Sequence, residues 1–507
     1  MSDVRTDWLG RWALYAPDRA ALVDPEAGRT ITYAEADLRA RRAARWLRDA
    51  HGVAPGDRVA LLAPNDLDAV LLFFATRRLG AILVPVNWRL APPEVAHVLR
   101  DAAPRVTVVA SEFAALAADA GASLSASPPV AAFDALVGAM DAGETLADDA
   151  GDFDAPCMIL YTSGTTGAPK GAVLTNRSVF WNAVNTTLRL NLTEADRTAI
   201  FAPLFHTGGW HVLTTPLLHA GGTVYLMRRF EPDAVLRLCD DAGLTILFGV
   251  PTMMAMLHDA PAFASARLGS VRYAIVGGEP MPVPLIHAWQ AKGVPIRQGY
   301  GLTEFGPNVF SLPEADAVRK AGSIGFPNFY IDVGIVGADG APVADGEVGE
   351  LLLRGPAAMD GYWQNPEATA ETIVGGWLRT GDLVRRDAEG YVYVAGRTKE
   401  MFISGAENVY PAEVEAALAQ HPAVAAVAVV GVPDARWGEV GHAVVVRRAG
   451  ADASADDLRA FCDGRLARFK IPKHVSFADA LPVADSGKVL RRALRDWPLP
   501  ATSPATP

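Results

Sequence analysis

One loop rich in glycine, serine and threonine constrains this chain more than any other segment. Residues 161–171 read YTSGTTGAPKG, and they follow an apolar run at 158–160 that predicts a short buried strand. The segment that begins at Asn176 predicts a helix. Backbone N–H groups and hydroxyls of such a loop can surround phosphate oxygens, and Lys170 adds a positive charge. Runs of this composition are more often plain surface loops. The position between a strand and a helix, together with the lysine, nevertheless favours a phosphate-binding loop.

Length, charge and cysteine content exclude several classes of protein. The 507 residues exceed the size of a single core, so two or more domains are expected. A net charge of −11 argues against general nucleic-acid binding, which requires a basic face. The cysteines, Cys157, Cys239 and Cys462, show neither a disulfide framework nor the spacing of metal ligands. No apolar run reaches membrane length and the N-terminus lacks a signal-peptide pattern, so we expect a cytoplasmic protein.

The order of apolar runs predicts an α/β fold. Strand-like runs such as Val59–Leu62 alternate with helical segments such as Leu67–Leu79 through the first half of the chain. This alternation implies parallel sheets covered by helices. Short strands separated by Asp-Gly and Glu-Gly turns follow and predict a small β region, after which a smaller α/β pattern begins. We expect a large N-terminal domain over residues 1–398, a C-terminal domain over 399–497 and a disordered tail over 498–507.

Five further motifs follow the loop in a fixed order. They are QGYGLTE at 298–304, WLRTGDL at 377–383, GRTKE at 396–400, ISGAENV at 403–409 and SGK at 486–488. The loop itself departs from the Walker pattern, because Pro169 precedes Lys170 and Gly171 follows it. Loop and motifs together resemble the adenylate-forming superfamily, and within it the acyl-CoA synthetases, over nearly the whole chain. The resemblance implies a mobile C-terminal domain that turns about a hinge at Lys399.

The chemistry of acid activation accounts for the residue types in these motifs. A carboxylate is a poor acyl donor, and ATP converts it to a mixed anhydride with AMP. Attack at the α-phosphorus concentrates negative charge, so cations and donors must face it. The resemblance implies catalytic roles there for Lys488 and Thr303, and for Glu304 as a ligand of Mg²⁺, which prefers hard oxygen donors.

The resemblance also implies a set of contacts with ATP. Tyr300 offers a flat face to adenine, and Asp382 suits the ribose hydroxyls beside Arg397. The predicted ATP-binding residues are Thr162, Ser163, Gly164, Thr165, Thr166, Gly167, Lys170, Gly278, Glu279, Pro280, Gly299, Tyr300, Gly301, Thr303, Asp382, Arg397 and Lys488.

An apolar segment, FAPLFHTGGW at 201–210, contains His206. A histidine among apolar residues is more often a core residue, but the resemblance implies that His206 borders the acyl pocket, gates it and belongs to the catalytic set. The segment lacks the Asp with which amino-acid-activating relatives hold the substrate ammonium. The predicted acyl pocket contains His206, Trp210, Val250, Met253, Met254, Gly277, Gly301 and Phe310. An apolar slot with adaptable methionines suits an aromatic or medium-chain acid.

The resemblance implies that coenzyme A is the acyl acceptor. The predicted CoA contacts are Arg89, Trp437, Phe469 and Lys473. Two positions depart from relatives: Ile471 stands where some carry Arg, and Ala406 where many carry Gly beside the pantetheine channel. A Cβ at residue 406 narrows that channel or opposes a positive φ, which bears on thioester formation and not on adenylation.

The sequence predicts a ligase that converts an acid, ATP and CoA to acyl-CoA, AMP and pyrophosphate with the help of Mg²⁺. One alternative is an adenylating enzyme that loads a carrier-protein thiol, although no carrier domain is recognised after residue 495. Another is a catalytically silent nucleotide-binding regulator on the same fold. The presence of Lys170, Glu304, Asp382 and Lys488 argues against the regulator. The sequence leaves open whether the acid is fatty or aromatic, which pathway it serves, and whether the protein forms a homodimer.

Overall fold

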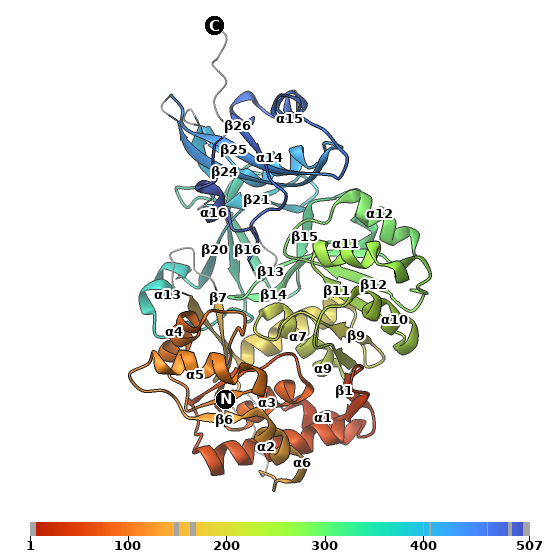
Figure 1. Cartoon of the computed structure of the whole chain (residues 1–507), viewed down its shortest axis with the longest axis vertical. Helices are drawn as coiled ribbons and strands as arrows, with labels where there is room; N and C mark the ends of the chain where they lie inside the picture. Colours follow the sequence, from red (N-terminus) through yellow and green to blue (C-terminus); the bar gives the residue numbers. More distant parts are fainter. Residues whose placement is uncertain are drawn as a thin grey trace. The chain divides into compact units, whose positions relative to one another are not determined.

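The structure is a computed structural model of the chain (Figure 1). It forms two compact units, one made of residues 1–333 and 353–379 and the other of residues 334–352 and 380–507. The predicted domain boundary at residue 399 stays a prediction. The described residues are 7–146, 152–162, 169–398, 400–404, 407–434, 436–463, 465–484 and 489–499.

A seven-stranded sheet lies in the first unit. Its strand order is β18-β8-β7-β4-β3-β5-β6, and β3, β4, β5 and β6 run parallel as predicted. The bounds are β3 Arg58–Leu62, β4 Ile82–Pro85, β5 Val106–Val109, β6 Val130–Ala132, β7 Pro156–Thr162, β8 Lys170–Thr175 and β18 Gly361–Tyr362. The predicted phosphate loop joins β7 to β8, which is antiparallel to β7, and the helix α7 (Asn176–Leu190) begins only after β8. The predicted order of strand, loop and helix is therefore wrong. The short apolar run after Lys170 pairs its backbone groups with β7 instead of continuing as loop.

Helices cover this sheet. Every residue of α3 (Leu67–Arg78) is buried, and α4 (Pro92–Ala102) and α5 (Ala114–Ala122) pack apolar side chains against β3 and β4. The helix α2 (Tyr33–His51) is capped by Thr32, whose hydroxyl accepts a hydrogen bond of 3.2 Å from the backbone N–H of Glu35. Other helices of this unit are α1 Trp8–Tyr15, α6 Phe133–Ala142, α8 Thr207–His211, α9 Thr214–Ala220 and α13 Pro366–Thr372. None of the helices in the described part of the chain is long and apolar enough to cross a membrane.

The first unit contains a second set of paired strands. The strands β9, β10, β11, β12 and β13 are parallel neighbours, and β14 is antiparallel to β13. Figure 1 shows the helices α10, α11 and α12 along one side of β11 and β12, where Met254 and Trp289 are fully buried. The bounds are β1 Ala20–Asp24, β2 Arg29–Thr32, β9 Arg197–Ile200, β10 Thr223–Leu226, β11 Ile246–Gly249, β12 Tyr273–Val276, β13 Ile296–Leu302, β14 Gly306–Ser311, β15 Ser323–Pro327, α10 Pro232–Ala242, α11 Pro251–Asp259 and α12 Val283–Ala291.

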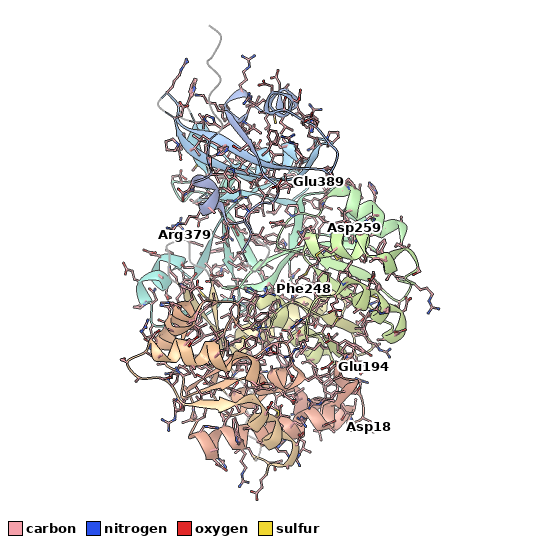
Figure 2. All side chains as sticks on the ribbon, viewed as in Figure 1. Asp18, Glu194, Phe248, Asp259, Arg379 and Glu389 are labelled. Carbon is pink, nitrogen blue, oxygen red and sulfur yellow. The ribbon has the colours of Figure 1, made fainter. Side chains whose placement is uncertain are left out.

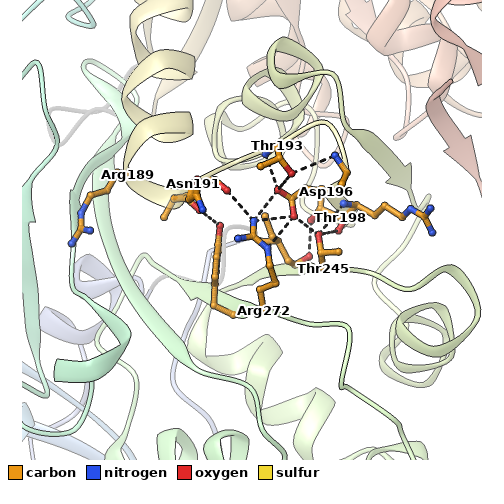
Figure 3. Close-up of polar contacts among 12 residues, drawn as sticks. Arg189, Asn191, Thr193, Asp196, Thr198, Thr245 and Arg272 are labelled. Carbon is orange, nitrogen blue, oxygen red and sulfur yellow. Dashed lines mark hydrogen bonds and ion pairs between the residues drawn. The ribbon is translucent and has the colours of Figure 1, made fainter. Parts of the chain in front are cut away.

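A buried carboxylate ties together the amino ends of three of these strands (Figure 3). Asp196, which precedes β9, is 2% exposed. It accepts hydrogen bonds of 2.8 Å from Arg272, before β12, and of 2.7 Å from Thr245, before β11. The buried carboxylate of this ion pair is held by further hydrogen bonds, which fix the local geometry. The opposite edge, at the carboxyl ends of the strands, is where open α/β sheets bind ligands.

The second unit has its own sheet and two small cores. Along β24, Val429 faces the helices α14 and α15, whereas its neighbour Val430 faces Leu494 on α16. Alternate side chains of a strand point to opposite faces, so both faces need a helical cover. The bounds are β16 Asp332–Val336, β17 Val348–Arg354, β20 Trp377–Arg386, β21 Val392–Arg397, β22 Phe402–Ser404, β23 Glu407–Val409, β24 Val424–Asp434, β25 Gly438–Arg447, β26 His474–Phe477, α14 Pro411–Leu418, α15 Ala455–Cys462 and α16 Arg491–Arg495. The short strand β19, Ile373–Val374, belongs to the first unit.

Candidate active site

The two ends of the phosphate loop are paired strand residues. Thr162 closes β7 and Lys170 opens β8, and the two are partners in the ladder. The Thr162 hydroxyl donates a hydrogen bond of 3.4 Å to the carbonyl of Lys170. The loop residues Ser163, Gly164, Thr165, Thr166 and Gly167 lie outside the described residues, as do Lys399, the predicted hinge, Ala406, and Lys488, the predicted catalytic lysine.

One tyrosine lies between the loop lysine and the predicted metal ligand. The Lys170 ammonium is 5.3 Å from the centroid of the Tyr362 ring, within cation–π range. The Tyr362 hydroxyl donates a hydrogen bond of 3.0 Å to Glu304. Burial, and then the negative charge of Glu304, raise the pKa of Tyr362, so its phenol keeps its proton and remains a donor. Sequence reasoning missed Tyr362. The available signal was its place in a short Gly-Tyr-Trp run, in which Gly361 has a positive φ of 145°.

The predicted ATP contacts Gly278, Glu279 and Pro280 follow the carboxyl end of β12 and are bonded to β13. The Gln298 side chain accepts a hydrogen bond of 3.1 Å from the Met281 N–H and donates one of 2.9 Å to the Glu279 carbonyl. It thereby fixes residues 278–281 against β13. Two residues on, the Tyr300 ring packs edge-on against Phe310 at 5.8 Å, and Phe310 itself is buried. Thr303 is half-buried in the turn that follows β13.

Glycine occupies three positions near these strands, and the physical reason for a glycine differs between them. A Cβ on Gly301 would lie 2.2 Å from the backbone of Pro307, so the fold itself requires glycine there. Gly278 has φ +87°, a region that glycine alone adopts readily. A Cβ on Gly277 would instead lie 3.5 Å from the Gly299 carbonyl, which is an ordinary contact. The fold therefore tolerates a side chain at residue 277. The packing of the protein does not explain the glycine, and the missing Cβ leaves space beside the predicted acyl pocket.

The predicted acyl-pocket residues differ in how far their side chains are buried. His206 precedes α8 and its ring contacts Phe205 at 4.7 Å. Trp210 is fully buried, packs against the Phe73 ring at 5.3 Å and donates its indole N–H to the Leu204 carbonyl. Met254 is likewise fully buried, whereas Val250 and Met253 are half-buried.

Phe248, near the end of β11, is a further residue of this region (Figure 2). It is half-buried, and a Cβ on Gly208 would lie 3.7 Å from its ring. The ring therefore lies beside α8, the helix that begins directly after His206. Sequence reasoning missed Phe248, and its place two residues before Val250 was the available signal.

The predicted ribose residues meet within the second unit. Asp382 on β20 and Arg397 on β21 are partners in the ladder, and Arg397 Nε lies 2.9 Å from the Asp382 carboxylate. Asp382 is 4% exposed. The Thr380 hydroxyl donates to the Leu351 carbonyl at 2.8 Å and accepts from the Asp382 N–H at 3.0 Å. A carboxylate fixed in this way is an oriented acceptor for hydroxyl groups.

The structure brings two of the predicted CoA residues together through an acid that sequence reasoning missed. Asp434 accepts hydrogen bonds from Lys473 Nζ at 2.5 Å and from the Trp437 N–H at 3.0 Å. The hydrogen bond from Lys473, followed by those from backbone N–H groups, lowers the pKa of Asp434 to about 2. Phe469 and Trp437 expose large apolar side chains in the same unit. In the first unit, Arg89 lies over the rings of Trp88 and Phe205 at 4.9 and 5.7 Å.

Two family models match the chain. The model "AMP-binding enzyme" matches residues 9–363, and "AMP-binding enzyme C-terminal domain" matches residues 413–488. The chain belongs to the AMP-binding enzyme family. It is an AMP-forming acid–CoA ligase with the α/β architecture of adenylate-forming enzymes, which confirms the family, fold class and enzyme class predicted from its motifs.

Relatives of this ligase match it along nearly its whole length. A feruloyl-CoA synthase of an Amycolatopsis species is 42% identical over 498 residues, which cover 97% of this chain and 99% of the relative. An indoleacetate–CoA ligase of Aromatoleum aromaticum is 41% identical over 499 residues, which cover 97% of each chain. The structure of o-succinylbenzoate coenzyme A synthetase from Bacillus subtilis, in complex with ATP and magnesium ion, matches with a TM-score of 0.87 and 35% identity over 97% of this chain and 99% of the other. These relatives support acid activation followed by transfer to CoA.

The residues of this ligase fit a magnesium ion that is held mainly by substrate. Among the described residues, no group of three or more His, Cys, Asp or Glu side chains could hold a metal. Glu304 offers a single carboxylate, which Tyr362 orients at 3.0 Å. Mg²⁺ at nucleotide sites is bound through one or two carboxylates together with phosphate oxygens and water. The donor set therefore suits Mg²⁺ that arrives with ATP.

Proposed function

We propose that the acid activated by this ligase carries an aromatic ring. Gly277 is the observation on which the proposal rests, because the fold tolerates a Cβ there and the chain nevertheless leaves the position empty. The half-buried Phe248, Val250 and Met253 supply apolar surface at the neighbouring end of β11. A flat ring buries both faces when it lies between an open glycine backbone and apolar side chains. The aromatic acids named for the feruloyl and indoleacetate relatives agree with this proposal.

The proposed roles of the remaining residues follow from their charge and position. Lys170 and the loop bind the leaving pyrophosphate, Glu304 binds Mg²⁺, and Tyr300 stacks on adenine. Asp382 accepts hydrogen bonds from the ribose. Mg²⁺ bound with ATP would neutralise phosphate charge during acid activation. Lys488, and rotation about Lys399 between the two half-reactions, complete the proposal, and both residues lie outside the described part of the chain.

The acceptor side of the proposal uses the surface around Asp434. This residue fixes Lys473 and the backbone of Trp437, so a cation and an aromatic ring stay close together. Such a pair suits a phosphate and an adenine ring of CoA. Arg89, supported on two aromatic rings, is the proposed third contact.

A substrate panel tests the proposal. Ferulic, indoleacetic and benzoic acids are compared with octanoic and palmitic acids at saturating ATP and CoA. Pyrophosphate release reports activation, and chromatography of the acyl-CoA reports transfer. We expect one of the aromatic acids to have the highest kcat/KM, by about tenfold or more, because burying an aromatic ring in a fitting site contributes over 1 kcal/mol. A fatty acid with the highest kcat/KM would contradict the proposal.

A further inference from the structure

The helix α4 contacts one flank of the phosphate loop through an acidic side chain. Asp101, in its last turn, accepts a hydrogen bond of 2.5 Å from the hydroxyl of Tyr161. Tyr161 is the residue before Thr162, at the end of β7. Burial, and then the hydrogen bond and charge of Asp101, raise the pKa of Tyr161, so the phenol stays protonated as a donor.

The other flank of the loop contacts the same helix. The ring nitrogen Nε2 of His97 lies 3.4 Å from the carbonyl oxygen of Pro169, the residue before Lys170. His97 and Asp101 are four residues apart, so they lie on the same face of the helix. One face of α4 therefore reaches both ends of the loop.

Trp363 connects the helix to β8 by a second route. Its indole N–H donates a hydrogen bond of 3.1 Å to the backbone carbonyl of Asp101, and its backbone N–H donates one of 2.7 Å to the Gly171 carbonyl. A Cβ on Gly171 would lie 3.2 Å from Cζ of Tyr161, so glycine lets the tyrosine ring pack closely over β8. The Tyr161 ring is therefore held by β8 below and by Asp101 at its hydroxyl.

We infer that Asp101 and Tyr161 are positioning residues for ATP, which fix the ends of the phosphate loop through α4. The inference rests on the proposed role of Lys170 and the loop in binding phosphate. Neither residue needs to touch ATP. Residues at the ends of the loop that are fixed before ATP arrives lose less conformational entropy on binding, so binding is tighter. The His97 contact on the second flank restrains Pro169 in the same way.

Two matched variants test this inference. Tyr161→Phe removes the donor and leaves the ring in place, and Asp101→Asn keeps an acceptor but removes its charge. We expect Tyr161→Phe to raise the KM for MgATP by roughly tenfold and Asp101→Asn by less, because a hydrogen bond to a charged group is worth the most. Transfer from synthetic acyl-AMP to CoA should keep its wild-type rate, because that half-reaction does not use the pyrophosphate site. The double variant should behave as Tyr161→Phe alone, since Asp101→Asn only weakens the hydrogen bond that Tyr161→Phe already removes.

A buried tyrosine away from the loop provides the control. The hydroxyl of Tyr33 donates a hydrogen bond of 2.7 Å to the Gly222 carbonyl, and the side chain is fully buried. Tyr33→Phe should lower the melting temperature as much as Tyr161→Phe without changing the KM for MgATP. An unchanged KM for MgATP in Tyr161→Phe would overturn the inference. Equal losses in both half-reactions would also overturn it, because they would show a general structural role. The substrate panel on the wild-type enzyme tests the proposed function separately.

Discussion

Tyr362 donates a hydrogen bond of 3.0 Å from its hydroxyl to the carboxylate of Glu304. The face of the same ring lies 5.3 Å from the ammonium of Lys170. Glu304 follows β13, Tyr362 belongs to β18 and Lys170 begins β8, so three distant segments meet at one aromatic side chain. The predicted metal ligand and the predicted phosphate lysine are therefore oriented by a common residue.

Tyr362→Phe should remove the hydrogen bond that orients the Glu304 carboxylate and leave the carboxylate itself in place. The ring remains beside Lys170, so the cation–π contact is kept. We expect the Mg²⁺ concentration for half-maximal pyrophosphate release to rise about threefold to tenfold, the effect of one hydrogen bond to a charged group. Tyr393→Phe is the matched control, because its hydroxyl donates to Asp387 at 3.3 Å in the second unit. Identical Mg²⁺ dependence of Tyr362→Phe and wild type would remove Tyr362 from this role.

Glu304→Gln should have the larger effect on the metal. A neutral amide is a poorer ligand for a hard dication than a carboxylate, so we expect weaker binding of Mg²⁺ with ATP, a higher Mg²⁺ concentration for the half-maximal rate, and a rate lowered by about a hundredfold. The measurement is the initial rate of pyrophosphate release over a range of Mg²⁺ at fixed ATP. Melting temperature should stay close to wild type, because an amide still accepts the Tyr362 hydrogen bond. An unaltered Mg²⁺ profile would show that the metal binds elsewhere.

The motifs in the sequence predicted the family, which the family models confirm, but the sequence did not indicate the residues that support the motif side chains. Lys170, Glu304 and Asp382 carry charges that the chemistry demands, so their types and order were informative. Tyr362 orients Glu304 through one hydrogen bond, and Asp434 accepts a hydrogen bond from Lys473 in the second unit; each pair is distant in sequence. A tyrosine or an aspartate is common on any surface, and only the folded chain shows what it contacts.

The strand that follows the phosphate loop is a part of the fold that the sequence likewise did not predict. The alternation of apolar runs indicated parallel sheets, which β3, β4 and β5 confirm. The run from Lys170 to Thr175 is too short to distinguish a strand from a loop by periodicity alone. Its antiparallel pairing with β7 depends on a partner that precedes the loop, and this partner cannot be read from the six residues themselves.

Gly277→Ala should change which acids are accepted. A Cβ there would make an ordinary contact at 3.5 Å, so the protein should fold with a melting temperature near that of wild type. We expect kcat/KM for the preferred aromatic acid to fall by roughly tenfold, while a small acid such as acetate is unaffected. Gly301→Ala is the contrasting variant: a Cβ 2.2 Å from the Pro307 backbone should lower stability and all activities together. Equal kcat/KM losses for all acids in Gly277→Ala would contradict the pocket assignment.

His211 should make stability depend on pH. It is 1% exposed, and burial, together with the Arg77 charge, lowers its pKa to about 3. The unfolded chain, with an ordinary histidine pKa near 6.5, binds a proton that the folded chain refuses. The contribution of neutral His211 to the free energy of unfolding is fully present above about pH 6.5 and is lost as the pH falls toward 3, by roughly 1.4 kcal/mol per pH unit. Urea unfolding at several pH values gives the free energy of unfolding as a function of pH. Between pH 6.5 and 3 this free energy should fall less steeply for His211→Asn than for wild type, whereas the surface variant His258→Asn should match wild type. Equal slopes for wild type and His211→Asn would contradict this account.

Lys488→Ala should separate the two half-reactions. Lys488 lies outside the described residues, so its role comes from the motif at 486–488 and remains a prediction. A lysine that stabilises charge at the α-phosphate acts only while acyl-AMP forms. We expect adenylation, measured as pyrophosphate release, to fall at least about a hundredfold, and the transfer of acyl-AMP to CoA to stay within about twofold of wild type. Lys488→Arg, which keeps the charge but not the geometry, should recover part of the adenylation rate. If Lys488→Ala slows transfer as much as adenylation, the residue supports the structure of the second unit and does not act on the phosphate.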